Sequence, residues 1–326
     1  MAARGSAVAK PGVKFAMGPR IAIALALTAL SAPAIPAGRS APRVQSSFLY
    51  AIDDGAGRRS TGWAALTWEP NNSELFLVAN GVVDIFNDNG LATYSFGDDS
   101  QVGSPVAVAA LENGDLMVVA TREMATQLIR CNFRGEPLAK VDLRGLPKEF
   151  ADFGPNAIAV AAGKVYLADK NSMRVVIAGP DGAVEKTFEL AKVIGLGPKD
   201  PAEAMMRGFN VDRDGNMLFT VASVFSAYVM SPGGKVRAFG QKGSTPGKFN
   251  IVSGIAADED GHLFLTDSLR AVVMVFDPSF QFLGEFGYRG PDPENLVSPF
   301  NLAVGNGRVY VTQSRGAVKA FAVRFD

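Results

Sequence analysis

The sequence predicts an all-β fold, a six-bladed β-propeller in which each blade is a four-stranded antiparallel sheet. A short motif, glycine or serine followed by one polar residue and an apolar run, occurs six times, starting at residues 73, 114, 163, 215, 261 and 307. Successive starts lie 41 to 52 residues apart, which is the size of a propeller blade. No long helical pattern intervenes, which excludes the α/β enzyme classes.

Each repeated unit has the pattern of four short strands. The six motifs read SELFLVANG, GDLMVVATR, GKVYLADKN, GNMLFTVAS, GHLFLTDSL and GRVYVTQSR, and a further apolar stretch precedes each motif after the first. A turn is expected 17 to 21 residues after the first five starts, at Gly90, Gly135, Gly182, Gly234 and Phe280. Four pairs are predicted to be hairpin turns because their backbone takes positive φ: Asn113-Gly114, Asp214-Gly215, Asp260-Gly261 and Asn306-Gly307.

The sixth unit is one strand short. It has apolar stretches near 300–304, 308–312 and 317–323, and no fourth stretch follows. The segment VQSSFLYAID, residues 44–53, has a strand pattern and belongs to no other unit. We therefore predict that it pairs as the outer strand of the sixth blade and closes the ring, which leaves no unpaired inner edge.

The first 37 residues have the pattern of a cleavable secretory signal. Four basic residues and no acidic one precede the apolar run IAIALALTAL at 21–30, and small residues and prolines follow it. Cleavage is expected after Ala34 or Ala37, and Met17 is an alternative start. The other reading is an uncleaved anchor, although the run is shorter than the ~20 apolar residues of a spanning helix. We expect a periplasmic or secreted protein with no membrane span after cleavage, and residues 38–326 as the propeller.

Composition narrows the function classes. The 326 residues include 32 basic and 32 acidic side chains, and removal of residues 1–37 leaves 28 basic and 32 acidic ones, a net charge of −4. This charge argues against a nucleic-acid ligand. The single cysteine, Cys131, excludes an internal disulfide and a cysteine zinc site, and the single histidine, His262, excludes sites built on several imidazoles.

The units resemble NHL repeats, most clearly at 208–247 and 254–290. The second of these reads GIAADEDGHLFLTDSLRAVVMVFDPSFQFLGEFGYRG, close to the family pattern of a glycine turn, an apolar strand, an aspartate and an arginine. The first two units depart from it, with Asn80 and Thr121 near the usual aspartate. The resemblance implies a six-bladed propeller. It does not imply one activity, because the family includes sensor domains, RNA-binding modules, lyases and interaction scaffolds.

We predict no metal site and no cofactor. The segments Asp212–Gly215 and Asp258–Gly261 look calcium-like, but glycine comes fourth and no bidentate glutamate follows, so a hairpin turn is the favoured reading. His262 follows a hairpin glycine and is expected at the surface. Calcium-dependent lactonases of related propeller shape use carboxylates and asparagines near the central channel, but no matching ligand spacing is present.

Arginines are the strongest ligand candidates. Four of them lie in loops between second and third strands, which gather on one face of the ring: Arg122, Arg174, Arg270 and Arg315. The arginine fork suits carboxylate or phosphate recognition. In the NHL pattern this arginine pairs with the preceding aspartate, and Asp169 with Arg174 and Asp267 with Arg270 fit that pairing. Arg122 and Arg315 lack it, so both a structural and a ligand-binding role stay open.

The longest connection, residues 191–207, is a candidate lid. Asp200 and Pro201 would begin a short helix that holds residues 202–206, and Met205 and Met206 would give it an adaptable apolar surface. The segment either covers one face or fills a groove between blades three and four.

Three functions fit the sequence. The favoured one is a non-catalytic scaffold, expected as a monomer, that binds a protein partner in the cell envelope through its loop face. The alternatives are a metal-dependent hydrolase or lactonase with carboxylates at the axis, and a polyanion-binding module that uses the arginine-bearing face.

Overall fold

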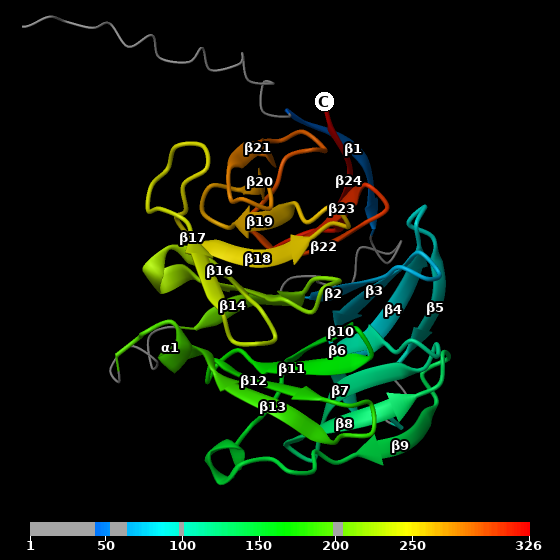
Figure 1. Cartoon of the computed structure of the whole chain (residues 1–326). Coiled ribbons are helices and arrows are strands. Elements are labelled where there is room, and N and C mark those ends of the chain that lie inside the picture. Colours follow the sequence, from blue (N-terminus) through cyan, green and yellow to red (C-terminus); the bar gives the residue numbers. More distant parts are fainter. Residues whose placement is uncertain (1–42, 53–63, 98–100, 198–204) are drawn as a thin grey trace, which may run out of the picture. The chain divides into compact units, whose positions relative to one another are not determined.

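The computed structural model describes residues 43–52, 64–97, 101–197 and 205–326, which form six four-stranded antiparallel sheets arranged as a ring (Figure 1). The contacts divide the chain into two units, residues 1–40 and 41–326, and all six sheets belong to the second. The predicted signal segment, residues 1–37, lies outside the described residues. The six-bladed β-propeller is thereby confirmed.

Within each of the first three blades, the four strands follow one another in chain order from the ring axis outward. Their strands are β2 (Ala65–Glu69), β3 (Glu74–Ala79), β4 (Val82–Asn87) and β5 (Ala92–Phe96); β6 (Ser104–Ala110), β7 (Leu116–Arg122), β8 (Ala125–Cys131) and β9 (Pro137–Val141); β10 (Ala157–Ala161), β11 (Lys164–Asp169), β12 (Arg174–Ala178) and β13 (Val184–Glu189).

The last three blades repeat the arrangement. Their strands are β14 (Met206–Val211), β15 (Met217–Val221), β16 (Ser226–Met230) and β17 (Val236–Phe239); β18 (Val252–Ala257), β19 (Leu263–Asp267), β20 (Val272–Phe276) and β21 (Phe282–Gly287); β22 (Pro299–Gly305), β23 (Arg308–Gln313), β24 (Val318–Phe325) and β1 (Val44–Ile52). In the described segments, helices are confined to single turns, η1 (Lys148–Phe150), α1 (Leu190–Val193) and η2 (Ala222–Val224).

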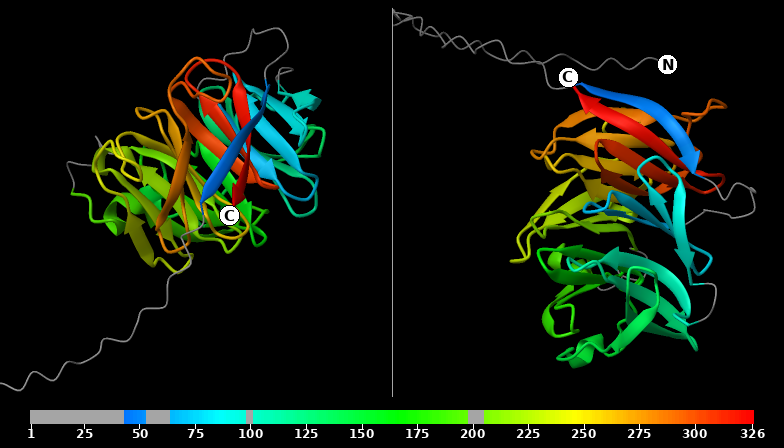
Figure 2. Two further views of the ribbon diagram at one scale, coloured as in Figure 1. Left: turned by 90° about the horizontal axis from the view of Figure 1, so that it is seen from above. Right: turned by 90° about the vertical axis from the view of Figure 1, so that its right-hand side faces the viewer.

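The ring closes as predicted. β1 pairs with β24 in antiparallel register from Val44 opposite Phe325 to Ile52 opposite Val318. The rings of Phe48 and Phe321 meet edge to face, with centroids 5.9 Å apart. Figure 2 shows the two strands, blue and red, side by side in both views. Strands from opposite ends of the sequence therefore share one sheet.

Antiparallel pairing sorts the loops onto two faces. The turns between second and third strands and the connections between blades lie on one face, which we call the connection face. The turns between first and second strands and between third and fourth strands lie on the opposite face, which we call the hairpin face. Among the described residues no helix is long and apolar enough to cross a membrane.

The turn prediction holds at the five spaced positions. Gly90, Gly135, Gly182 and Gly234 take φ of 77° to 89°, and Phe280 takes φ of 71° in place of a glycine. The hairpin-pair prediction needs correction. Both residues have positive φ only at Asn306-Gly307, whereas at the other three pairs only the glycine does. Those turns are one residue longer, with the amide of Asp258 bonded to the carbonyl of His262, and need one left-handed residue.

Apolar clusters fill each of the six interfaces between neighbouring blades. The middle strands are buried on both faces: along β11, Val165 and Leu167 pack toward blade two, while Tyr166 and Ala168 pack toward blade four. Two-sided burial explains why these strands read as continuous apolar runs in the sequence.

Buried threonines tie the last blades together. The hydroxyl of Thr266 in β19 accepts a hydrogen bond from the amide of Gly254 at 2.7 Å and donates one to the carbonyl of Phe300 on the next blade at 2.6 Å. Thr220 makes the same two bonds, with Gly208 and Ser253. A Cβ added to Gly254 would lie 2.6 Å from the carbonyl oxygen of Phe300, so glycine permits this close approach near the axis.

Candidate functional site

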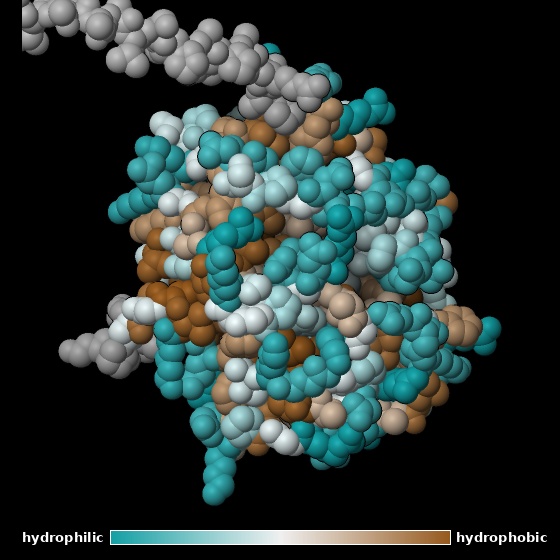
Figure 3. Space-filling view, in the orientation of Figure 1, coloured by the Kyte–Doolittle hydropathy of each residue, from teal (hydrophilic) through white to brown (hydrophobic). Residues whose placement is uncertain are grey.

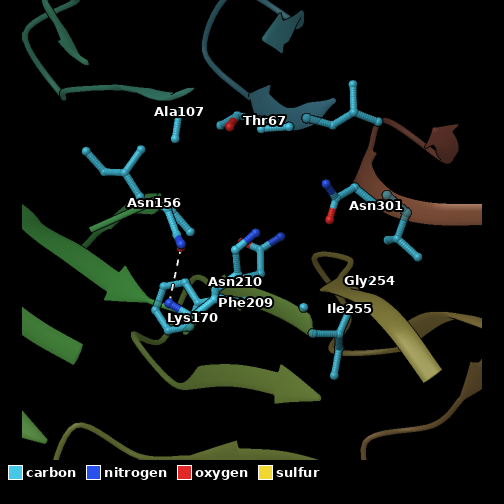
Figure 4. A pocket seen from close by; sticks show the side chains of 15 residues that line it. Thr67, Ala107, Asn156, Lys170, Phe209, Asn210, Gly254, Ile255 and Asn301 are labelled. Atoms are coloured by element: carbon cyan, nitrogen blue, oxygen red, sulfur yellow. Dashed lines mark hydrogen bonds between the residues drawn. The ribbon is translucent and has the colours of Figure 1, made fainter. Parts of the chain in front are cut away.

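The ring axis holds a channel whose narrow end lies toward the connection face. All six inner strands or the residues just before them contribute to a cavity of about 50 Å³ at this end. Figure 4 shows its labelled polar side chains around a common space: Thr67, Asn156, Lys170, Asn210 and Asn301. Among the described residues that line this cavity there is no carboxylate, imidazole or thiol.

Lys170 reaches the cavity from the turn that follows β11. Its backbone amide donates a hydrogen bond to Oδ1 of Asn156 at 3.1 Å, which fixes the turn against the residue that precedes β10. Within the described part of the chain, no carboxylate forms an ion pair with its ammonium group. Burial lowers the pKa of Lys170, because the charged form loses its hydration.

The other polar groups of the cavity are partly used by the fold. Oδ1 of Asn210 accepts from the amide of Val211 at 2.8 Å, and Nδ2 of Asn301 donates to the carbonyl of Ala64 at 2.7 Å. The hydroxyl of Thr67 donates to the carbonyl of Val108 at 2.8 Å. These bonds leave the amide nitrogens of Asn156 and Asn210 as donors, and the side-chain oxygens of Asn301 and Thr67 as acceptors.

Toward the hairpin face the channel widens to about 610 Å³. The two parts share Leu66, Thr67, Ile158, Phe209 and Asn210 in their linings, so the narrow cavity and the wide part are continuous. Acidic side chains gather at the wide mouth with one arginine: Asp212, Asp258, Glu259, Asp260 and Arg213. The channel thus has an ammonium group at its narrow end and carboxylates at its wide mouth.

A possible metal-binding group lies beside this mouth. Asp258, Asp260 and His262 each offer a ligand atom, and these atoms lie within 4.8 Å of one another. Oδ1 of Asp258 accepts from the amides of Asp260 at 3.0 Å and His262 at 2.8 Å, which is the hairpin-turn role that the sequence predicted. The expectation of a surface histidine needs correction: His262 is half-buried, lies 2.8 Å from the Asp258 carboxylate and stacks on Phe325 at 4.0 Å.

Two of the four predicted arginines form ion pairs, one with a residue of its own blade and one with a residue of the connection before its blade. Arg270 is buried and lies 2.5 Å from Glu285. Arg174 lies 2.5 Å from Asp152 and over the ring of Phe150 at 5.3 Å. Their partners therefore differ from the predicted Asp267 and Asp169.

Asp169 and Asp267 instead stabilise the turns that follow β11 and β19. The carboxylate of Asp169 accepts from the amides of Asn171 and Ser172, and that of Asp267 accepts from the amides of Leu269 and Arg270. Carboxylate oxygens that accept hydrogen bonds from the amides of their own turn are not available to a guanidinium group. The predicted side-chain pairing therefore does not form.

Arg122 and Arg315 are exposed on the connection face and have no ion-pair partner among the residues that the structure describes. Arg122 ends β7, and Arg315 lies in the turn between β23 and β24. All four arginines belong to turns between second and third strands and so share the connection face.

The predicted lid is only partly described. Asp200 and Pro201 lie outside the described residues. Met205 is half-exposed, whereas Met206 is buried as the first residue of β14 and packs between blades three and four. Met206 is therefore in a strand rather than a helix, and the two methionines do not form one apolar surface.

The lysine and asparagines of the axis were not predicted from the sequence. The signal available for the asparagines was an asparagine within a largely apolar inner strand, as in Phe209-Asn210 and Phe300-Asn301. Lys170 had no such signal, because it follows a middle strand and reaches the axis only through the turn that Asn156 holds.

Comparisons with known proteins find the fold in other molecules. No protein-family model matches the chain, and no curated protein matches it. A protein of unknown function from Bacteroides thetaiotaomicron superposes with a TM-score of 0.60 at 13% identity, over 87% of this chain and 76% of that chain.

Two further solved structures carry functional names. A virginiamycin B lyase from Staphylococcus aureus superposes with a TM-score of 0.53 at 13% identity, over 79% of each chain. A gluconolactonase-like protein superposes with a TM-score of 0.55 at 14% identity, over 86% of this chain and 93% of the other. Identities this low establish shared architecture and no shared activity. The chain is a six-bladed β-propeller whose structural neighbours include lyase and gluconolactonase-like propellers.

Proposed function

We propose that this protein is an exported, non-catalytic binding protein of the cell envelope, built on an NHL-type propeller, whose connection face binds a protein partner. The observation that carries this proposal is the distribution of exposed apolar side chains. Among the described residues, seven of the twelve exposed large hydrophobic side chains lie on the connection face: Met124, Val193, Met205, Val224, Leu269, Tyr288 and Val297.

These side chains lie in turns and connections, where solvation normally favours polar residues. Met124 is 99% exposed, and Leu269 and Tyr288 are 55% and 52% exposed. Figure 3 shows apolar residues gathered near β16, β17 and α1, at the left of the view. Several exposed apolar groups on one face favour an interaction surface over a solvated one.

The charges on this face indicate the chemistry of the partner. Arg122 and Arg315 have no described ion pair, so their guanidinium groups are available to carboxylates. A partner surface that combines apolar side chains with aspartate or glutamate would match them. Export through the signal pattern of residues 1–37 would place this encounter in the periplasm or outside the cell.

The experiment is retention of envelope proteins on immobilised, purified protein. Met124→Asp and Leu269→Asp put a charge into the proposed surface, and we expect each to lose at least about tenfold in affinity for the retained partner. The matched control is Phe133→Asp, at a 64% exposed apolar residue in a turn of the hairpin face. Equal loss in the control, or no loss in either variant, would contradict the proposal.

A metal-dependent hydrolase is the second candidate, favoured by the Asp258, Asp260 and His262 group beside the wide mouth of the channel. Carboxylate and imidazole ligands suit a divalent ion, which would act as a Lewis acid on a lactone or ester. Metal-stimulated turnover that Asp258→Asn abolishes would favour this candidate.

A polyanion-binding module is the third. It would use Arg122 and Arg315, and it predicts salt-sensitive retention on heparin that falls in the Arg122→Ala and Arg315→Ala variants. Retention that does not depend on salt, or that both variants keep, would exclude it.

A further inference from the structure

We propose that the narrow end of the axial channel binds the carboxylate of a small 2-hydroxy acid, with Lys170 as its charged anchor and the amide nitrogens of Asn156 and Asn210 as additional donors. This site lies inside the ring, apart from the exposed apolar residues of the connection face. The inference therefore goes beyond the proposed partner binding and does not depend on it.

The charge of Lys170 favours an anionic ligand. The residue is half-buried, and its ammonium group has no carboxylate partner in the described part of the chain. Partial removal of an unpaired charge from water is costly. Its side chain lines a cavity in which no described residue is acidic. A ligand carboxylate would supply the missing counter-charge inside the cavity, where partial exclusion of bulk water strengthens the pair.

The balance of donors and acceptors in the cavity also favours a carboxylate. The fold uses Oδ1 of Asn156 for the amide of Lys170 and Oδ1 of Asn210 for the amide of Val211. What the two asparagines have left are their NH2 groups, which donate and do not accept. Together with the lysine ammonium they form a donor-rich site, and two oxygens of a carboxylate are the acceptors that suit it.

Two oxygen acceptors in the cavity indicate which group lies next to the carboxylate. Nδ2 of Asn301 is bonded to the carbonyl of Ala64, and the hydroxyl hydrogen of Thr67 is bonded to the carbonyl of Val108. Their remaining oxygens accept hydrogen bonds on the opposite side of the cavity (Figure 4). A hydroxyl on the carbon beside the carboxylate can donate to one of them, which favours a 2-hydroxy acid over a simple one.

The size of the cavity limits the size of the ligand's head group. The narrow cavity of about 50 Å³ holds little more than a carboxylate and its neighbouring carbon. The continuous wide part, about 610 Å³, is lined near the junction by Leu66, Ile158 and Phe209. An apolar tail attached to the 2-hydroxy acid would extend there, so affinity is expected to rise with tail size.

The test measures binding by isothermal titration calorimetry with glycolate, lactate and mandelate, which differ only in the tail. We expect binding of at least one acid with a Kd of about 1 mM or below, and at least tenfold weaker binding of the neutral analogue lactamide and of propanoate, which lacks the hydroxyl. Failure of all three acids to bind at about 10 mM would overturn the proposal.

The variants locate the site. Lys170→Met is expected to weaken binding at least about tenfold and Asn210→Ala about threefold to tenfold, because a charged and a neutral donor are lost. The matched control Lys140→Met changes an exposed lysine of β9 and should bind like the parent protein. Unchanged affinity in Lys170→Met would contradict the assignment.

A second readout does not depend on the folding of the variants. In protein with 13C-labelled lysine, the side-chain resonance of Lys170 reports its titration. Binding of a carboxylate should raise the pKa of Lys170, because an adjacent negative charge favours the ammonium form. A titration curve that is identical with and without acid would contradict contact between the ligand and the lysine. Neither result bears on retention of a protein partner.

Discussion

Oδ1 of Asn156 accepts a hydrogen bond from the backbone amide of Lys170 at 3.1 Å, and this bond holds the turn after β11 against the start of β10. The two residues belong to the same blade, but the bond directs a lysine from a middle-strand turn into the ring axis. A local contact thereby determines the chemistry of the narrow cavity.

Replacement of Asn156 tests this positioning. Asn156→Ala leaves the Lys170 amide without its acceptor, and we expect a loss of about 1–2 kcal/mol in the free energy of unfolding, measured with urea. Asn156→Asp keeps an acceptor and adds a carboxylate beside the lysine. This variant should retain most of the stability and raise the pKa of Lys170. Equal stability of Asn156→Ala and the parent protein would show that the bond does not hold the turn.

Ring closure by β1 predicts a large effect of truncation. Removal of residues 1–52 deletes the outer strand of blade six and exposes apolar surface of β24. We expect this loss to remove much of the stability of about 5–15 kcal/mol that is typical of folded proteins. The control is removal of residues 1–37 alone, which should leave the thermal midpoint nearly unchanged. A cooperative melt at the same temperature after both deletions would contradict closure by β1.

The threonine bridges between blades predict a matched pair of substitutions. Thr266→Val keeps the shape but leaves the Gly254 amide without an acceptor and the Phe300 carbonyl without this donor. We expect a cost of about 2–4 kcal/mol in urea unfolding, because such groups are costly when buried. Thr93→Val removes a hydroxyl bond from exposed Thr93 on the outer strand β5 and should cost less than about 1 kcal/mol. Similar losses in the two variants would exclude a special role for the bridge.

Cys131 predicts a pH dependence. Burial, reinforced by the charge of Asp115, raises the pKa of its thiol from 9.0 to about 12. The folded protein therefore keeps this proton at a pH where the unfolded chain has lost it, so stability should fall as pH rises above about 9. In Cys131→Ala, the part of this fall in stability with rising pH that is due to the thiol should disappear. A thiol reagent at pH 8 should label the parent protein only after unfolding, and rapid labelling of the folded protein would contradict burial.

The fold was predictable because its signals are local and repeated. Each motif contains its own glycine turn and apolar strand, and even Phe280, which breaks the glycine pattern, occupies the same left-handed turn position. The unpaired pattern of residues 44–53 was enough to predict closure, because every other unit already had four strands.

The site was less predictable because it depends on the ring. Asn156, Asn210 and Asn301 lie far apart in the sequence, and only closure brings their strands around one axis. The strand topology places the four arginine-bearing loops on one face. The bonds of Asp169 and Asp267 to their own turns could not be predicted from the sequence. Side-chain partners depend on distances that a repeat pattern does not contain.

The central claim is that the propeller binds without catalysing a reaction, and elemental mass spectrometry of residues 38–326 after gel filtration tests it most directly. We expect far less than one calcium or zinc ion per chain and no turnover of lactones or esters when either ion is added. About one ion per chain, lost in Asp258→Asn and accompanied by hydrolysis, would contradict the claim and identify the Asp258, Asp260 and His262 group as a catalytic metal site.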